Sequence, residues 1–327
     1  MIALATRKIA SVLTRLARVA TYTDVNSVTM QAEKSLFLLG QIAAHQVRAC
    51  ERLDVLADAA FKVSSQWGED GIIEWLVHAV DVNSTTFVEF GVEDFSEANC
   101  RFLMEHRNWK GLVFDGDYSN IKKLHQYPHA WKYDLRAECH FITVENINGL
   151  IQDAGFEGDL GILSVDIDGA DYWVYDAIEC VRPAILILEY NSVFGDLLPV
   201  TVPYRADFIR QKAHSSGLYY GASLKAMQDL ALKKGYTFVG TPRTGANAFF
   251  VRSDLAERVL AKIDRVVAFP SLFREARNDA GELIYARGLD RFDQILGMMV
   301  VNTSTGLDVK LERVDEFYSK NWVQDVE

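Results

Sequence analysis

The chain has 327 residues, of which 49% are hydrophobic and 24% are charged, and its formal net charge is −11. This composition is typical of a globular protein and excludes a mainly disordered, collagen-like or low-complexity chain. The negative charge also argues against a nucleic-acid-binding protein, because binding phosphates requires a basic surface.

Cysteine spacing and hydropathy indicate where such a protein works. The four cysteines are scattered without a CxxC pair, which argues against a zinc site or a disulfide framework and suits a reducing cytoplasm. No apolar run of the sequence reaches the roughly 18–20 residues of a membrane-spanning helix. We therefore expect a cytoplasmic protein.

Residues 1–60 predict a helical N-terminal arm. Residues 1–20 contain four bases and no acid, and their apolar side chains recur at helical spacing. Such a basic amphipathic helix docks on a protein domain, lies on a membrane surface or belongs to a cleaved targeting peptide, and the three alternatives stay open. Residues 31–60 continue with an imperfect 3-4 repeat, typical of an oligomerisation arm or of a helix packed on the core. We expect the arm to serve assembly into a homo-oligomer or peripheral membrane contact through residues 1–20.

From residue 61 onward, short apolar runs alternate with helical patterns. The runs predict strands at Thr86–Phe90, Gly111–Phe114, Gly161–Val165, Ala184–Leu188, Tyr236–Val239 and Ala248–Val251, and the patterns predict helices from Glu69 and at 97–106, 119–126, 145–154, 172–179 and 223–235. Strands buried on both faces appear as unbroken apolar stretches, and alternation with helices implies parallel crossover connections. Residues 61–252 therefore predict a doubly wound, mainly parallel α/β sheet.

The pattern weakens after Arg252. Leu255–Ile263 predicts a helix, residues 274–286 predict a hairpin around Asn278–Gly281, and residues 292–301 are apolar again. We interpret residues 253–327 as a C-terminal extension that packs on the domain and completes or caps it.

Ligands of open α/β sheets bind beyond the carboxyl ends of the strands, so the residues after each strand are the first candidates for a site. Glu89 and Gly91 end the first strand, and further acids follow them. The single glycine permits close approach of a ligand, and the acids suit a cationic ligand with an amine, such as S-adenosylmethionine, better than a phosphate. Asp115 ends the second strand, where an acid commonly binds ribose hydroxyls. We assign these three residues to a cofactor site, with an ordinary turn and a solvated acid as the alternatives.

Two later strands also end in polar residues. Asp166 and Asp168 follow one strand, and Glu189 and Asn191 follow the next. All four offer oxygen ligands at one sheet edge, which predicts a site for Mg²⁺ or Mn²⁺. Helix capping and solvated strand ends are the alternatives for these residues.

Two residues are candidates for a general base. Asp166 is a candidate base in an account without a metal. His214, which follows the strand predicted at Ala184–Leu188, is a second candidate, and a structural role is the alternative for it.

A set of short motifs extends this interpretation to a family. They are SQWGEDG at Ser65–Gly71, Phe87–Gly91 followed by Asn99, WKGL at Trp109–Leu112, DIDGAD at Asp166–Asp171, Gly235-Tyr236, and NAFFV at Asn247–Val251. Together, across roughly residues 64–252, they resemble the FkbM-type S-adenosylmethionine-dependent methyltransferases. Two positions depart from the family: Asp94–Ser96 stands where a second glycine is common, and Asp115-Gly116 stands where many members have Glu-Pro.

The resemblance implies a Rossmann-like class I methyltransferase fold, S-adenosylmethionine as cofactor, and methyl transfer to a hydroxyl group of a saccharide, glycan or other small molecule. Some methyltransferases of this fold hold Mg²⁺ on acids after the fourth and fifth strands, which Asp166 or Asp168 matches together with Glu189 and Asn191. Two other functions stay open: a non-catalytic scaffold that keeps the fold, and a nucleotide-dependent oxidoreductase. The absence of a GxGxxG motif counts against the oxidoreductase.

Overall fold

The computed structural model describes residues 28, 30–127 and 130–326 of the chain. The amphipathic helix predicted within residues 1–20 lies outside this part. Among the described residues, none of the helices combines the length and the apolar character needed to cross a bilayer.

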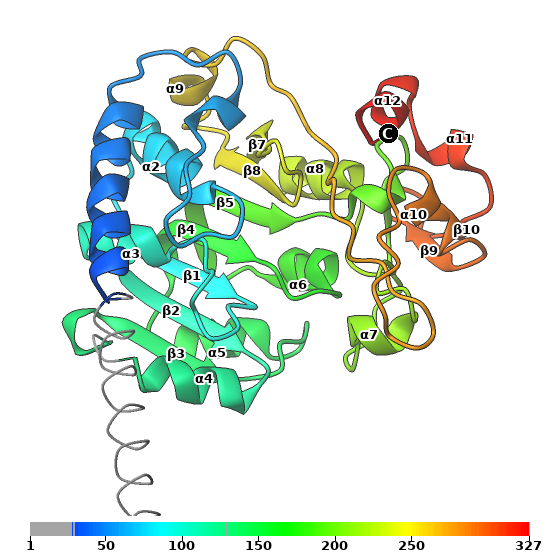
Figure 1. Cartoon of the computed structure of the whole chain (residues 1–327), viewed down its shortest axis with the longest axis horizontal. Helices are drawn as coiled ribbons and strands as arrows, with labels where there is room; N and C mark the ends of the chain where they lie inside the picture. Colours follow the sequence, from blue (N-terminus) through cyan, green and yellow to red (C-terminus); the bar gives the residue numbers. More distant parts are fainter. Residues whose placement is uncertain (1–27, 29, 128–129, 327) are drawn as a thin grey trace, which may run out of the picture.

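A seven-stranded sheet forms the centre of the molecule (Figure 1). Its strands, in spatial order, are β3 (Leu135–Cys139), β2 (Lys110–Asp115), β1 (Thr86–Phe90), β4 (Gly158–Val165), β5 (Val181–Glu189), β8 (Asn247–Arg252) and β7 (Tyr236–Gly240). The first five are parallel, and β8 is antiparallel to both of its neighbours. The order 3-2-1-4-5 is that of doubly wound nucleotide-binding sheets. This confirms the predicted doubly wound, mainly parallel, Rossmann-like α/β sheet.

Helices cover both faces of the sheet, as crossover connections between parallel strands require. One face packs against η1 (Leu56–Ala59), α2 (Glu69–Val80), α3 (Arg101–Arg107), α4 (Tyr118–His125) and α9 (Glu257–Leu260). The other packs against α5 (Ile147–Asp153), α6 (Asp171–Ala177) and α8 (Leu224–Lys233). All six predicted strands are present, each with ends extended by at most three residues. The edge strand β3 was not predicted, because its alternating Arg136 and Glu138 lack the apolar run of a buried strand.

The predicted N-terminal helix ends earlier than its periodicity indicated. Residues 30–48 are helical, and a turn follows at residue 49. A Cβ at Gly40 would clash with Val63, so the absent side chain lets the helix pack closely. Leu53 instead forms a bridge with Ile263, and η1 is a buried 3-10 turn. Tertiary packing of apolar side chains beyond residue 50 therefore replaces the predicted continuation of the helix.

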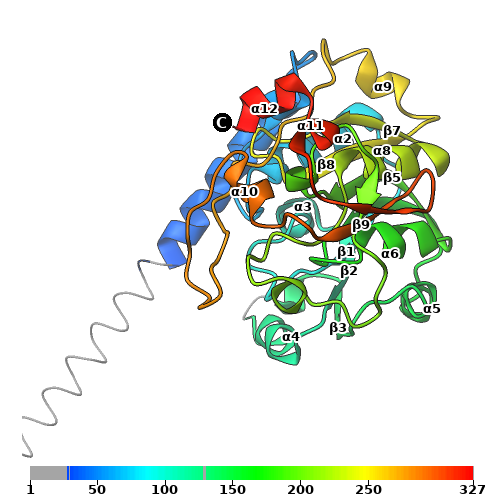
Figure 2. The same cartoon turned by 90° about the vertical axis from the view of Figure 1, so that its right-hand side faces the viewer.

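The C-terminal segments lie beyond the carboxyl ends of the central strands (Figure 1) and form a second layer over that edge (Figure 2). They contribute β9 (Met299–Asn302) and β10 (Asp308–Lys310), which join β6 (Val200–Thr201) in a small antiparallel sheet. The remaining short helices are η2 (Ala130–Lys132), η3 (Ser192–Phe194), α7 (Arg210–Ala213), α10 (Asp290–Asp293), α11 (Val314–Phe317) and α12 (Lys320–Val326). An antiparallel bridge between Arg277 and Leu283 agrees with the predicted hairpin.

Candidate functional site

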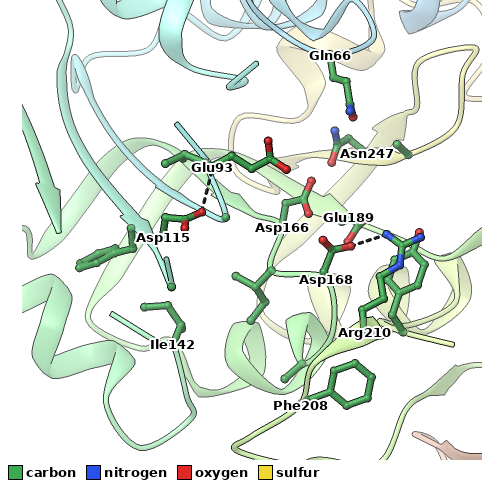
Figure 3. Close-up of a pocket in the computed structure, with 18 of the residues that line it drawn as sticks. Gln66, Glu93, Asp115, Ile142, Asp166, Asp168, Glu189, Phe208, Arg210 and Asn247 are labelled. Atoms are coloured by element: carbon green, nitrogen blue, oxygen red, sulfur yellow. Dashed lines mark hydrogen bonds and ion pairs between the residues drawn. The ribbon is translucent and has the colours of Figure 1, made fainter. Parts of the chain in front are cut away.

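A cavity of about 620 Å³ opens at the carboxyl edge of the sheet (Figure 3). We call one part the β1–β2 end, and it is lined by Gly91, Val92, Glu93, Phe114, Asp115 and Gly116. We call the other part the β4–β5 end, and it is lined by Asp166, Asp168, Glu189, Arg210, Tyr220 and Asn247. One cavity thus joins Gly91 and Asp115 to Asp166, Asp168 and Glu189, five of the strand-end residues predicted from the sequence.

Gly91 and Asp115 shape the β1–β2 end. Gly91 has a φ of +71°, and a Cβ there would overlap the carbonyl oxygen of Asp166, so both conformation and space require glycine. Asp115 accepts hydrogen bonds at Oδ1 from the Asp117 amide (2.8 Å) and Asn120 Nδ2 (3.1 Å), and at Oδ2 from the Glu93 amide (2.8 Å). A carboxylate offers about four lone-pair positions. Oδ2 therefore retains room for one further donor, such as a hydroxyl group, rather than for two.

Glu89 is buried beneath this end and does not line the cavity. Its two carboxylate oxygens accept the amides of Asn99 (2.7 Å) and Cys100 (3.0 Å) at the start of α3. Burial raises the pKa of Glu89 to about 7, although the two amides favour its charged form. In this structure Glu89 anchors the loop and the helix that follow β1.

Asp166 and Glu189 face each other at the β4–β5 end (Figure 3). Burial raises the pKa of Asp166 well above its usual range, and the charges of Asp168 and Asp171 raise it further. Burial likewise raises the pKa of Glu189, and the next largest cause is the charge of Asp166. Two carboxylates this close are expected to share a proton, because the second ionisation is opposed by the first.

Asp171 is a third acid at this end, and it was not predicted as a site residue. Oxygens of Asp166, Asp171 and Glu189 lie within 4.8 Å of one another. Both oxygens of Asp171 accept backbone amides, from Ile167 (2.7 Å) and Gly169 (2.9 Å). Asp171 therefore holds the turn after β4, a role visible in sequence only as an acid at the start of a helix.

Asp168 forms an ion pair at the same end. Its carboxylate contacts Arg210 Nη1 at 2.6 Å (Figure 3), and Arg210 Nη2 contacts Glu275 at 2.7 Å. The guanidinium also stacks 3.7 Å from the ring centre of Tyr220. Arg210 thus ties the loop after β4 to the C-terminal segment. No sequence pattern indicated Arg210, because its partners lie 42 and 65 positions away in the chain.

Asn191 and His214 lie outside the lining of the cavity. Asn191 is buried, and its Nδ2 donates to the carbonyls of Leu218 (2.8 Å) and Tyr220 (2.9 Å) while its Oδ1 accepts the Val193 amide (3.0 Å). Its polar atoms thus hold neighbouring loops. His214 Nδ1 is engaged by Ser216, 2.8 Å from the hydroxyl and 3.2 Å from the amide.

The Ser65–Gly71 motif supplies two lining residues, Gln66 and Trp67. Its acids have a structural role. Asp70 Oδ2 accepts the amides of residues 63–65 at 2.7–2.9 Å, and burial raises its pKa to about 6. Glu69 is fully buried and accepts the Trp67 amide at 2.8 Å. These acids fold the loop so that the two lining side chains reach the cavity.

Comparisons with known proteins bear on the fold. No protein-family model matches the chain, and no curated protein sequence matches it. Similar solved structures include an S-adenosylmethionine-dependent methyltransferase from Clostridium acetobutylicum ATCC 824 (10% identity, TM-score 0.35, covering 56% of this chain and 89% of that one). A second is the magnesium protoporphyrin IX methyltransferase from Synechocystis PCC 6803 with bound S-adenosylmethionine (12% identity, TM-score 0.34, covering 57% of this chain and 78% of that one). A third is the N-terminal domain of EvdMO1 with S-adenosylhomocysteine bound (10% identity, TM-score 0.38, covering 65% of this chain and 95% of that one).

The strand order of the sheet, and not these similarities, defines the fold. The resemblance to the FkbM family stays a prediction, since no family model matches.

Proposed function

We propose that this chain is an S-adenosylmethionine-dependent O-methyltransferase that acts on a hydroxyl group of a saccharide or glycan. One observation carries the proposal: a single cavity in a class I methyltransferase fold connects Gly91 and Asp115 to the facing carboxylates of Asp166 and Glu189. The first pair suits a nucleoside cofactor, and the second suits the removal of a proton from an acceptor.

The charge and shape of the cavity fit S-adenosylmethionine, which is a cation with an ammonium group. Seven acids and three arginines line the cavity, so its potential favours a positively charged ligand. Asp115 would accept a ribose hydroxyl at the free position of Oδ2. Apolar Phe114, Phe141 and Ile142 line the same region and suit the purine ring. When bound, S-adenosylmethionine supplies an electrophilic methyl group.

The acceptor needs a base, because a sugar hydroxyl is a poor nucleophile at neutral pH. Asp166 is the residue we assign to this role, with Glu189 sharing its proton. Their raised pKa values move the pair toward the operating pH, where a general base is most effective. His214 could serve only after a rearrangement that freed it from Ser216 and brought it into the cavity.

A bound Mg²⁺ or Mn²⁺ is the second candidate for activating the acceptor. The three carboxylates within 4.8 Å of one another favour it. Asp168 and Asn191, by contrast, have other partners, which leaves Asp166 and Glu189 as the free ligands. Mg²⁺ commonly binds through one or two carboxylates, with waters and substrate completing its shell. An ion at this site would stabilise an acceptor oxygen as its proton leaves.

Chelation separates the two accounts. If Asp166 acts as a metal-free base, EDTA should leave methyl transfer unchanged. If a metal is required, EDTA should abolish transfer, Mg²⁺ or Mn²⁺ should restore it, and Glu189→Gln should weaken the metal dependence.

The proposed function is tested by supplying methyl-labelled S-adenosylmethionine with a panel of mono- and oligosaccharides and detecting products by mass spectrometry. We expect a product that is heavier by 14 mass units plus the mass of the label and that is identified as a methyl ether. Products methylated at carbon or nitrogen would contradict O-methyl transfer. A protein that binds S-adenosylmethionine but methylates nothing in the panel would favour the scaffold alternative, and binding of NAD⁺ instead would favour an oxidoreductase.

A further inference from the structure

The side chain of Asn247 leaves one buried polar atom without a partner at the β4–β5 end. Asn247 is 5% exposed and lines the cavity. Its Nδ2 donates to Glu69 Oε1 at 3.1 Å, whereas Oδ1 has no partner among the described residues. Because a carboxylate can only accept, the amide is fixed with its nitrogen toward Glu69. Asn247 Oδ1 is therefore held as an acceptor that lacks a donor.

Glu189 provides a second unpartnered oxygen next to it. Glu189 and Asn247 are direct partners in the β5–β8 ladder, and Glu189 Oε2 also has no hydrogen-bond partner among the described residues. Figure 3 shows both side chains near Asp166, with Gln66 beyond Asn247. Buried polar atoms in folded proteins are nearly always hydrogen-bonded. Asn247 Oδ1, which cannot be protonated, therefore indicates a ligand donor, and Glu189 Oε2 beside it accepts a second donor when the proton shared with Asp166 lies on Asp166.

An aromatic wall belongs to the same part of the cavity. Trp67 and Phe273 both line the cavity and stack with ring centres 4.6 Å apart and planes inclined by 21°. Trp67 remains 38% exposed. The negative face of an aromatic ring attracts weakly positive C–H groups. This wall therefore suits a ligand with an apolar C–H face.

Buried polar contacts hold the wall in place relative to Asn247. Glu69 accepts the Trp67 amide with one oxygen and Asn247 Nδ2 with the other. On the opposite side, the loop of Phe273 is held by Ser271, whose hydroxyl contacts Ser192 Oγ at 2.7 Å and receives Arg291 Nη1 at 3.0 Å. The wall and the amide are thus fixed before any ligand arrives, which lowers the entropic cost of binding.

We propose that Trp67 and Asn247 form the acceptor subsite and that it binds a pyranose ring. The C–H face of the ring lies against the aromatic wall, and its hydroxyl groups donate to Asn247 Oδ1 and Glu189 Oε2. This inference rests on the proposed methyl transfer and assigns its acceptor to particular residues. The pyranose belongs either to a glycan or to a nucleotide sugar, since both present the same ring chemistry.

The test uses the full chain loaded with S-adenosylhomocysteine and measures saturation transfer to ligand protons by NMR. The probes are methyl hexopyranosides, a trisaccharide, a nucleoside-diphosphate hexose and catechol as an aromatic diol. We expect transfer to the C–H protons of at least one sugar probe, reduced at least fivefold by Trp67→Ala and by Asn247→Leu. Trp131→Ala is the matched control, because Trp131 is 80% exposed and lies outside the cavity lining.

Calorimetry with S-adenosylhomocysteine accompanies every variant, so that a folding defect is distinguished from a lost subsite. If Asn247→Leu fails to bind the cofactor product, Asn247→Ser and Trp67→Ala decide the outcome. Absence of a signal from every sugar, binding of catechol alone, or full binding by both variants would overturn the subsite while leaving cofactor binding intact. Absence of cofactor binding in the wild type would instead contradict the proposed function.

Discussion

The two ends of the cavity use carboxylates in opposite ways. At the β1–β2 end, Glu89 and Asp115 have their oxygens occupied by backbone amides and one side-chain amide. At the β4–β5 end, Asp166 and Glu189 face each other, and Glu189 Oε2 has no hydrogen-bond partner among the described residues. The first end is hydrogen-bonded except for one open position at Asp115 Oδ2, whereas the second leaves a carboxylate oxygen without any partner among the described residues.

This difference indicates a structural role for the carboxylates at the first end and a role in proton transfer for those at the second. A carboxylate that accepts several amides fixes the backbone around it. Carboxylates that crowd one another have raised pKa values and can exchange protons near neutral pH. We therefore expect changes at the β1–β2 end to affect stability and cofactor affinity, and changes at the β4–β5 end to affect turnover.

The largest effect is expected from Asp166→Asn. Loss of a general base should lower the rate of methyl transfer by about 10²–10⁴-fold, while the affinity for S-adenosylhomocysteine changes little. Initial rates and calorimetry measure the two quantities. Asp176→Asn is the control, since Asp176 is exposed on α6. Near-normal turnover of Asp166→Asn would show that Asp166 is not the general base and that the two ends do not differ in this way.

The pH dependence of stability tests the structural role of Glu89 at the β1–β2 end. Burial raises the pKa of Glu89 from an ordinary value of 4.5 to about 7. Between these values the folded state keeps the proton that the unfolded state has lost, so the free energy of unfolding falls as the pH rises through this window. The contribution is about 3 kcal/mol. Chemical denaturation from pH 4.5 to 8 should show this loss, and Glu89→Gln should remove that part of the slope. Equal slopes would mean that Glu89 is charged throughout.

A pair of glycine substitutions measures the contact between the two ends. Gly91→Ala should destabilise the fold by about 2–4 kcal/mol, because its positive φ adds strain and its Cβ would overlap the Asp166 carbonyl. Gly155→Ala has a similar φ of +83° but no atom within 4 Å of the added Cβ, so it should cost only about 1 kcal/mol. Thermal unfolding gives both values. Equal losses would show that backbone strain alone matters at Gly91.

The smallest expected effect concerns Asp115. Asp115→Ala should weaken S-adenosylhomocysteine binding by roughly tenfold or more, since a hydrogen bond to a charged group contributes about 1.5–3 kcal/mol. Turnover at saturating cofactor should fall far less than in Asp166→Asn. Asp117→Ala is a fair comparison, because Asp117 caps α4 without lining the cavity. Unchanged affinity would show that Asp115 does not bind the ribose.

The sequence was informative where adjacent parallel strands fix position. Gly91, Asp115, Asp166 and Glu189 line one cavity because the carboxyl ends of their strands meet at one edge. The sequence was less informative where loops determine the direction of a side chain. Asn191 has the predicted place in the chain, but its side chain turns into neighbouring loops, and Asp168 is drawn to Arg210.

Contacts between distant segments were invisible in the sequence. Trp67 meets Phe273 across about two hundred residues, and Asn247 meets Glu69 across a similar separation. Neither pair follows a local period, and both depend on the C-terminal extension or the final strands folding over the cavity. A tryptophan or an asparagine in a motif carries no signal of such a partner.

The most direct test of the central claim is a calorimetric titration of the wild-type protein with S-adenosylhomocysteine and, separately, with NAD⁺. The account predicts binding of one S-adenosylhomocysteine per chain with a dissociation constant in the micromolar range or below, and no heat with NAD⁺. Absence of binding by S-adenosylhomocysteine to the folded protein, or saturable binding of NAD⁺ in its place, would contradict it.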